Sequence, residues 1–201
     1  MKAKKLVCII LAVVVGLSFM MIFSACGDKE NTKVKVEMEN GDTFIIELYP
    51  EYAPETAKNF EKLVKEGFYD GLTFHRISEG FMAQGGGYYP PGIDGAKKSS
   101  DSIKGEFSKN GFSKNTLKHT KGVISMARSD NFDSASSEFF IMYDTATHLD
   151  GNYAAFGKVI EGMETIEKFI QVEKIAGFAA DLGQATIPVE PIIIKQMTIV
   201  N

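Results

Sequence analysis

Two short segments near the start of the chain alternate apolar and polar residues with a period close to two. They span residues 34–38 and 44–48, and Asn40-Gly41 lies between them. The apolar positions are Val34, Val36, Met38, Phe44, Ile46 and Leu48. Such alternation is typical of strands that bury one face, and an Asn-Gly pair favours the tight turn of a hairpin. The pattern therefore predicts a β-hairpin and a mainly β fold.

The rest of the chain contains further short strand-like runs and only two helical segments. We expect strands over residues 73–77, 81–84, 122–127, 138–142, 154–160 and 192–200. Pro54 suits the first position of a helix that ends by Gly67, and residues 163–169 form a second helix. Eight short strands with two helices favour a closed barrel with helical caps. Residues 88–119 are interpreted as an extended surface loop, whereas residues 171–190 carry no pattern that places them.

The start of the chain has the pattern of a secretory signal. Three lysines within residues 2–5 precede an uncharged run over residues 6–25. The sequence Phe23-Ser24-Ala25-Cys26 resembles a bacterial lipobox, whose cysteine is lipidated and becomes the new N-terminus. We therefore expect a signal peptide over residues 1–25, a short lipidated tether over 26–32 and one domain over 33–201. An uncleaved membrane helix over the apolar run remains the alternative.

Both interpretations place the domain outside the cytoplasm, at the bacterial cell membrane. Cys8 and Cys26 are the only cysteines, so the domain has neither a disulfide nor a catalytic thiol. Loss of the signal would remove three lysines and no acid, leaving a domain more acidic than the −4 of the whole chain. This charge argues against nucleic acid as a partner. The histidines at 75, 119 and 148 lack the spacing of a zinc site, and we expect a monomer without cofactor or metal.

The stretch from Phe74 to Gly86 carries the clearest chemical signal. It combines the permanent cation Arg76, the apolar pair Phe81-Met82 and the amide Gln84. None of these groups is a good nucleophile. The serines of residues 125–137 lack the nucleophile-elbow pattern of hydrolases. A fixed donor beside apolar surface suits the holding of a neutral apolar group more than the breaking of a covalent bond.

This stretch resembles the signature of the cyclophilin-type peptidyl-prolyl isomerases. Four further blocks occur in the family's order and at close to its spacing: residues 122–127, 137–141, 149–151 and 156–159. The resemblance covers roughly residues 33–200. It implies a closed eight-stranded antiparallel β-barrel capped by two α-helices, and an enzyme that catalyses rotation about X-Pro peptide bonds. It also implies proline-containing polypeptides and unfolded exported proteins as partners.

The resemblance also implies roles for individual residues. Arg76 matches the catalytic arginine, which donates a hydrogen bond to the imide nitrogen of the rotating bond. The matching substrate-binding residues are Phe81, Met82, Gln84, Ala127, Arg128, Glu138, Phe140, His148, Leu149 and Tyr153. Strand alternation predicts that Phe139 and Ile141 point into the barrel and that Phe140 points outward. The site should therefore lie on the outer face of the barrel.

Several of these positions depart from the family pattern. Glu138 stands where the family usually has glutamine; we expect it to attract Arg76 and slow the enzyme, unless it only orients the guanidinium. Arg128 replaces an asparagine whose contact is made by the backbone. His148 and Tyr153 replace a tryptophan and a histidine of the cyclosporin-sensitive members. Glu138 is also the feature that favours the alternative function, a proline-binding module of the same fold with little catalysis.

Overall fold

The computed structural model describes residues 30–91, 100–176 and 184–200, and all of these except residue 30 belong to the compact unit Asn31–Asn201. The expected signal peptide and Cys26 lie outside the described residues. Among the residues that are described, no helix is both long enough and apolar enough to cross a membrane.

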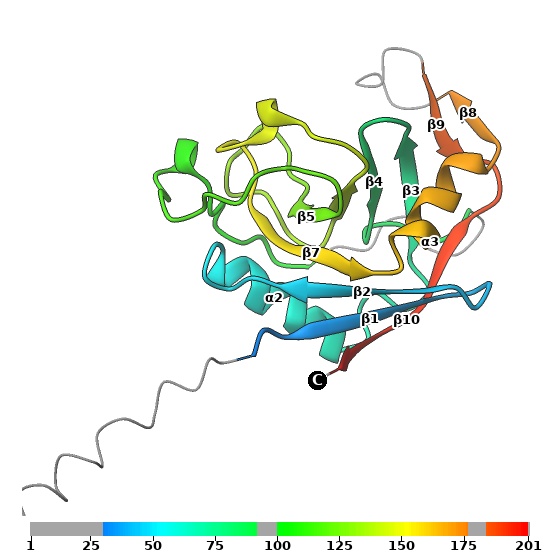
Figure 1. The fold of residues 1–201 in the computed structure, drawn as a ribbon, viewed down its shortest axis with the longest axis horizontal. Helices are drawn as coiled ribbons and strands as arrows, with labels where there is room; N and C mark the ends of the chain where they lie inside the picture. The colour runs from blue at the N-terminus through cyan, green and yellow to red at the C-terminus, as the bar shows by residue number, and fades with distance from the viewer. Residues whose placement is uncertain (1–29, 92–99, 177–183, 201) are drawn as a thin grey trace, which may run out of the picture. The chain divides into compact units, whose positions relative to one another are not determined.

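Eight strands close into an antiparallel barrel, as the sequence predicted (Figure 1). They are β1 (Lys33–Met38), β2 (Thr43–Leu48), β3 (Thr73–Ser78), β4 (Met82–Gly85), β5 (Val123–Met126), β6 (Phe139–Met142), β7 (Ala155–Glu161) and β10 (Ile192–Val200). Their order around the barrel is β1-β10-β3-β4-β6-β5-β7-β2. In the β1–β2 hairpin the Gly41 amide donates to the Met38 carbonyl at 2.9 Å, and Gly41 has a φ of +86°. Glycine adopts this left-handed conformation at low cost, which accounts for the Asn-Gly turn.

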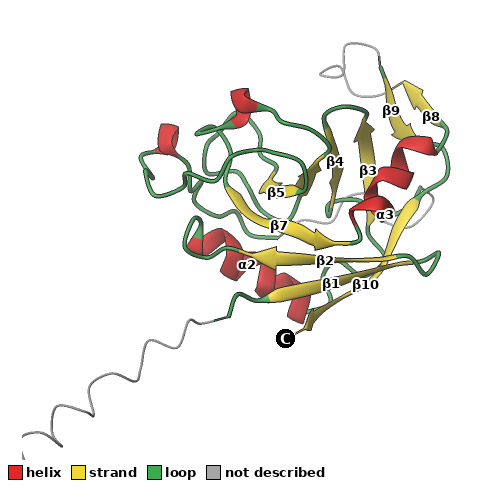
Figure 2. Ribbon diagram, in the orientation of Figure 1, coloured by secondary structure: helices red, strands yellow, loops and turns green. Residues whose placement is uncertain are grey.

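Two α-helices pack against the barrel, α2 (Pro54–Lys65) and α3 (Met163–Lys168), as Figure 2 shows. Phe60 of α2 is fully buried, and its ring contacts those of Tyr69, Phe139 and Phe156 with centroids 5.1–5.4 Å apart. Ile166 of α3 is buried in the same core. Three short 3-10 helices complete the helical elements of the described residues: η1 (Ser108–Asn110), η2 (Thr147–Leu149) and η3 (Phe169–Gln171).

The N-terminus of α2 is capped by a residue far along the chain. Ala53, at the N-cap position, has no side chain that can accept a hydrogen bond. The buried Glu106 carboxylate accepts from the backbone amides of Glu55 and Thr56 at 3.1 and 2.8 Å, and from the Thr56 hydroxyl at 2.7 Å. A negative charge here satisfies amides that have no partner within the helix and opposes the positive end of the helix dipole.

The Glu106 contact changes the interpretation of the region 88–119 as a surface loop. The structure describes residues 88–91 and 100–119 of this region, and Glu106, Phe107, Asn115 and His119 are buried. Asn115 donates to the carbonyls of Glu106 and Ala155, both at 2.9 Å. The segment therefore lacks regular strands but is fastened to the barrel by buried polar contacts.

Residues 171–190, which the sequence left unplaced, contain a small separate hairpin. Strands β8 (Lys174–Ala176) and β9 (Ala185–Pro188) pair with each other as a two-stranded sheet outside the barrel. β9 packs against β3, and Figure 1 shows the hairpin beside β3 and α3.

We predict that Glu106→Ala lowers the free energy of unfolding by about 2–4 kcal/mol, because it leaves the Glu55 amide and the buried amide and hydroxyl of Thr56 without their charged acceptor. Urea unfolding followed by circular dichroism measures this change. Glu55→Ala is the matched control, because Glu55 is an exposed acid in the first turn of the same helix and should contribute less than about 1 kcal/mol. Equal losses of unfolding free energy in the two variants would show that Glu106 contributes only through its charge and not through its buried hydrogen bonds.

Candidate functional site

Strand β6 separates the interior of the barrel from an apolar surface on its outside. Phe139 and Ile141 belong to the main core, whereas Phe140 and Met142 belong to a second apolar cluster. This split confirms the alternation predicted for the strand. The second cluster also contains Met82 of β4 and Leu149 of η2. The outer face of β4, β5 and β6 therefore carries its own packed apolar layer.

A hollow of about 550 Å³ opens over this layer. It brings together every substrate-binding and catalytic position predicted from the sequence except Glu138. Its lining residues are Arg76, Phe81, Met82, Gln84, Lys109, Ala127, Arg128, Phe140, His148, Leu149, Asn152 and Tyr153. They come from β3, β4, β6, η1, η2 and the connecting segments, so the hollow brings together residues that are far apart in the sequence.

Aromatic contacts hold the apolar walls of the hollow in place. The Phe140 ring meets Tyr153 edge to face, with centroids 5.8 Å apart. On another side, His148 stacks against Phe81 at 5.9 Å. Both arrangements are among the geometries that aromatic pairs prefer. The residues that replace the usual tryptophan and histidine thus still form walls of the hollow.

A chain of polar contacts runs along one side of the hollow from a cation to a carboxylate. Arg76 Nη1 donates to Gln84 Oε1 at 3.2 Å, and Gln84 Nε2 donates to Glu138 Oε2 at 3.0 Å. His75 Nε2 lies 3.6 Å from the same Glu138 oxygen. A carboxylate can only accept, so Glu138 turns the amide nitrogen of Gln84 toward itself and the amide oxygen toward Arg76. Glu138 is therefore linked to the guanidinium through Gln84.

A smaller hollow of about 310 Å³ adjoins the first and shares Gln84, Ala127 and Arg128 with it. Glu138 lines this second hollow together with Tyr88 and three serines, Ser129, Ser134 and Ser136. Gly87 leaves the space that the Glu138 side chain fills, since a Cβ at Gly87 would lie 2.4 Å from Glu138 Cγ. The second hollow is therefore polar, with a carboxylate at its boundary with the first.

Arg128 has a larger role in the structure than a backbone contact requires. Its Nε and Nη2 donate to the Asn152 carbonyl at 3.0 and 2.9 Å. Its guanidinium also lies over the rings of Tyr153, Phe107 and Phe132, at 4.5, 5.2 and 5.0 Å from their centroids. Cation–π contacts of this kind hold a guanidinium in one place. The side chain thus ties three segments together at the rim of the hollow.

Sequence reasoning missed two residues that line the hollow, Lys109 and Asn152. Lys109 lies in the segment interpreted as a surface loop, and its amide donates to the Gly151 carbonyl at 3.0 Å. Asn152 follows the recognised block 149–151 directly. The hydrogen bond between Lys109 and Gly151 brings Lys109 to the hollow, and nothing in the sequence predicts this bond.

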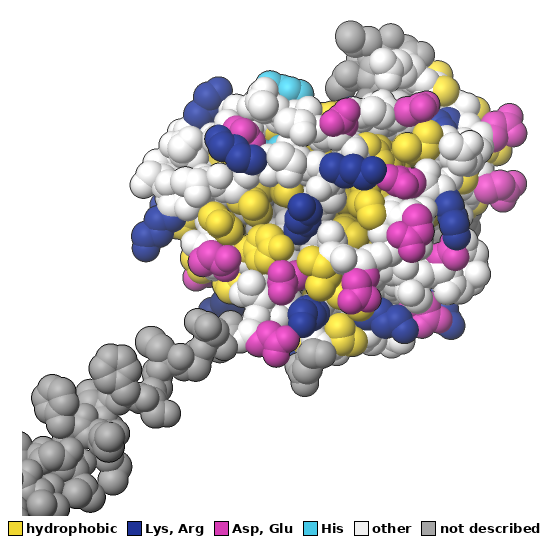
Figure 3. Space-filling model, in the orientation of Figure 1, with side chains coloured by type: hydrophobic (Ala, Val, Ile, Leu, Met, Phe, Trp, Pro, Cys, Tyr) yellow, Lys and Arg dark blue, Asp and Glu magenta, His cyan; other side chains and the backbone are white. Residues whose placement is uncertain are grey.

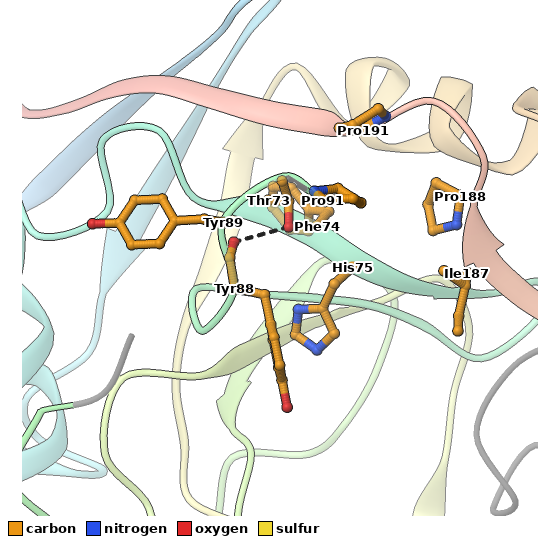
Figure 4. A pocket seen from close by; sticks show the side chains of 9 residues that line it. All are labelled: Thr73, Phe74, His75, Tyr88, Tyr89, Pro91, Ile187, Pro188 and Pro191. Atoms are coloured by element: carbon orange, nitrogen blue, oxygen red, sulfur yellow. Dashed lines mark hydrogen bonds between the residues drawn. The ribbon is translucent and has the colours of Figure 1, made fainter. Parts of the chain in front are cut away.

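A third hollow, of about 260 Å³, lies between β3 and the β8–β9 hairpin (Figure 4). Three prolines and two tyrosines contribute to its lining, and Figure 4 shows Pro91, Pro188 and Pro191 around it. Thr73 donates to the Tyr88 carbonyl at its edge at 3.0 Å. It lacks the arginine and the amide that flank the first hollow, so it offers apolar contact without a fixed cationic donor.

The first hollow suits the binding of a neutral apolar group next to a cation. The described residues that line it include no serine, cysteine, aspartate or glutamate. Among the described residues, no group of three histidines, cysteines or acids could hold a metal ion. The side chains lining it that can donate hydrogen bonds are Arg76, Gln84, Lys109, Arg128, His148, Asn152 and Tyr153. On the face drawn in Figure 3, basic and acidic side chains are interspersed, with apolar surface between them.

Comparisons with known proteins agree with this chemistry. The family model described as "Cyclophilin type peptidyl-prolyl cis-trans isomerase/CLD" matches residues 33–199. The chain is 38% identical over 154 residues to a probable peptidyl-prolyl cis-trans isomerase of Brucella suis, an alignment that covers 72% of this chain and 74% of that protein. It is 44% identical over 127 residues to peptidyl-prolyl cis-trans isomerase B of Bacillus subtilis, covering 63% of this chain and 82% of the relative.

Solved structures show the same fold. The crystal structure of a cyclophilin type peptidyl-prolyl cis-trans isomerase of Cryptosporidium parvum superposes with a TM-score of 0.68 at 27% identity, covering 85% of this chain and 98% of that one. A second structure of that protein, determined in the presence of the dipeptide Ala-Pro, gives a TM-score of 0.67.

Proposed function

Because this chain belongs to the cyclophilin-type peptidyl-prolyl cis-trans isomerases, we propose that the hollow on the outer face of the barrel is its active site and that it serves exported proteins at a membrane surface. The observation that carries the assignment is the position of Arg76. It is the cation that Gln84 fixes by a hydrogen bond at the edge of an apolar hollow.

The chemistry of the reaction explains why such a hollow suffices. Rotation about an X-Pro bond has a barrier of about 18–20 kcal/mol, which amide resonance sets, and no bond is broken. At the twisted state the imide nitrogen loses resonance and becomes a better hydrogen-bond acceptor. A donor that meets this nitrogen stabilises the transition state more than either ground state, which lowers the barrier.

Some residues of the hollow would hold the proline ring, and Arg76 would donate a hydrogen bond to the imide nitrogen. Phe81, Met82, Phe140 and Leu149 form the apolar surface that would receive the proline ring. Arg76 would donate to the imide nitrogen while the residue before the proline rotates. Gln84 occupies one side of the guanidinium and so limits the orientations open to the remaining donors. Ala127 lies between the two hollows, where a peptide backbone would pass from one to the other.

We predict that Arg76→Ala lowers kcat/KM for a short X-Pro peptide by about 100-fold or more with the fold intact, because it removes a donor used mainly in the transition state. Arg76→Lys should also be slow, since an ammonium cannot keep one donor on Gln84 and present another in a rigid fork. A protease-coupled isomerisation assay measures both variants, and circular dichroism checks folding. Full turnover in folded Arg76→Ala would rule out this mechanism.

The negative charge of Glu138 in the second hollow should make the protein prefer substrates with a cationic side chain near the proline. Its carboxylate lines that hollow, and the guanidinium of Arg128, which lines the hollow as well, is held by carbonyls and aromatic rings. A peptide whose proline occupies the first hollow would place a neighbouring side chain in the second. A lysine or arginine there would lie close to the Glu138 carboxylate, and the walls of the hollow would partly shield this ion pair from water.

We predict that the wild-type protein turns over a peptide with lysine two residues before the proline about two- to five-fold faster than the glutamine analogue, and that Glu138→Gln removes this preference. Glutamine can still accept from Gln84, so turnover of the neutral peptide should be no lower than in the wild type. Glu79→Gln is the control of equal charge change, since Glu79 is exposed and lines neither hollow. An unchanged preference in Glu138→Gln would show that the carboxylate does not face the substrate.

The proposed place of action follows from the start of the chain. A basic, then apolar segment precedes Cys26 in a lipobox-like sequence. A tether over residues 26–32 would hold the domain about 20 Å from the lipid, since an extended residue spans roughly 3.3 Å. Exported chains arrive at this surface unfolded, and slow X-Pro isomerisation limits the folding of such chains.

We predict that Cys26→Ser releases the protein from the membrane fraction or leaves its precursor uncleaved, because the thiol would be the lipid acceptor. Metabolic labelling with a radioactive fatty acid, followed by fractionation, tests this. Cys8→Ser is the matched control and should keep both label and location. Equal labelling of the wild type and Cys26→Ser would contradict the lipoprotein assignment and leave the isomerase assignment untouched.

A further inference from the structure

The third hollow adjoins the second through a shared wall of two rings. Tyr88 lines both the second hollow and the third. His75 lines the third hollow, and its Nε2 atom lies 3.6 Å from Glu138 Oε2 of the second. The rings of His75 and Tyr88 have centroids 4.5 Å apart, and Figure 4 shows them side by side. The first, second and third hollows therefore follow one another in a row.

An irregularity in β3 places this wall next to the guanidinium of the first hollow. The pairing of β3 with β4 shifts between Phe74 and Arg76, so His75 is the extra residue of a β-bulge. Phe74 is fully buried in the core, whereas His75 and Arg76 are both half-buried. Bulges redirect side chains in this way and are frequent beside active sites. Two consecutive residues of β3 thus line two different hollows, the third and the first.

The third hollow suits an apolar side chain. The described residues that line it include no lysine, arginine, aspartate or glutamate, and most of them are prolines or carry aromatic rings. Its volume of about 260 Å³ lies below the range of roughly 300–1,000 Å³ that is typical of pockets for free small-molecule ligands. A single side chain of a bound polypeptide is therefore a better fit than an independent ligand.

One wall of the third hollow belongs to the β8–β9 hairpin, which is fastened to the rest of the fold. Ile187 of β9 lines the hollow, and the preceding residue, Thr186, is only 1% exposed. The Lys174 ammonium of β8 donates to the carbonyls of Ile170 and Val172 at 2.6 and 3.0 Å. Strand β9 also packs against β3. These contacts position the hairpin as a wall of the hollow.

We propose that the third hollow is a binding subsite for an apolar side chain of the substrate, located four residues before the proline that isomerises. The proposal rests on the proposed active site. Arg76 of the first hollow and Thr73 of the third are three residues apart on β3, a span of about 10 Å. An extended peptide covers this span in three to four residues, at roughly 3.3 Å per residue.

The alternation of side chains along an extended peptide selects the fourth residue. Successive side chains point to opposite faces, so the residues two and four positions before the proline point the same way. The second of these positions would place its side chain in the third hollow when the first faces Glu138 in the second hollow. The side chain three positions before the proline would point away from the barrel.

The first test compares octapeptides that differ at one position before the proline. In the wild-type protein, phenylalanine four positions before the proline should lower KM about three- to ten-fold relative to serine, through partial burial of the ring. The value of kcat should change less than about two-fold, because a contact remote from the rotating bond is equal in ground and transition states. Phenylalanine three positions before the proline should have little effect. NMR exchange spectroscopy measures both constants without a protease.

The second test asks whether Ile187 is responsible for this preference. Ile187→Ser removes an apolar part of the wall and should bring the KM ratio of the serine and phenylalanine peptides close to one. Ile187→Trp should also abolish the preference, because the larger side chain would fill the hollow. Ile160→Ser is the matched control and should keep the full ratio, since Ile160 of β7 is 40% exposed and lines none of the three hollows.

The outcomes separate the subsite from the proposed active site. The two peptides are compared within each variant, so a general loss of activity cancels in the ratio, and circular dichroism checks folding. A ratio near one in the wild type, or a full ratio in folded Ile187→Ser, would overturn the subsite. If Ile187→Ser does not fold, the ratio in Ile187→Trp decides. Full turnover of a short peptide by folded Arg76→Ala would instead reject the proposed active site, whatever the Ile187 variants do.

Discussion

The alternation of β6 is the constraint on which the rest of the structure depends. Phe139 and Ile141 fill the barrel, and the residues between and after them, Phe140 and Met142, form the outer apolar layer. One strand thus contributes to two packed layers. A shift of one residue in its register would exchange the two sets and remove both the core and the hollow. The register of β6 therefore determines both the core of the barrel and the floor of the hollow.

The outer layer differs from an ordinary core in its polar support. On one side, Gln84 connects Arg76 with Glu138. Behind Phe140, His119 connects Ser125 with Asp150. In the first chain the Glu138 carboxylate fixes the amide of Gln84, which lines the hollow. In the second chain the Asp150 carboxylate fixes the imidazole of His119, which stacks on Phe140 in the wall of the hollow. In the proposed active site the apolar residues would receive the proline ring, and the two polar chains lie beside and behind that surface.

Local patterns were enough to predict most of the barrel and most of the site. Alternation located the strands, Asn40-Gly41 located a hairpin, and the family resemblance assembled the site residues from distant segments. The β8–β9 hairpin was not predicted, because Ile175 and Ile187 pair outside the barrel without a periodic apolar run around them. Glu106 and His119 were also missed as buried residues. Their hydrogen-bond partners include Thr56 and Asp150, which lie 50 and 31 residues away along the chain and which composition does not reveal.

The closed barrel has a consequence for the encounter with unfolded chains. Each of its eight strands is already hydrogen-bonded on both sides. Open sheet edges recruit extended polypeptides and can start aggregation. An isomerase acting on unfolded chains, as proposed above, would meet many such polypeptides, and a closed barrel gives them no continuous ladder to extend. On the barrel, contact is then made through the side chains of the hollow and a short piece of backbone. Such limited contact favours release, so the same molecule could act again on the next proline.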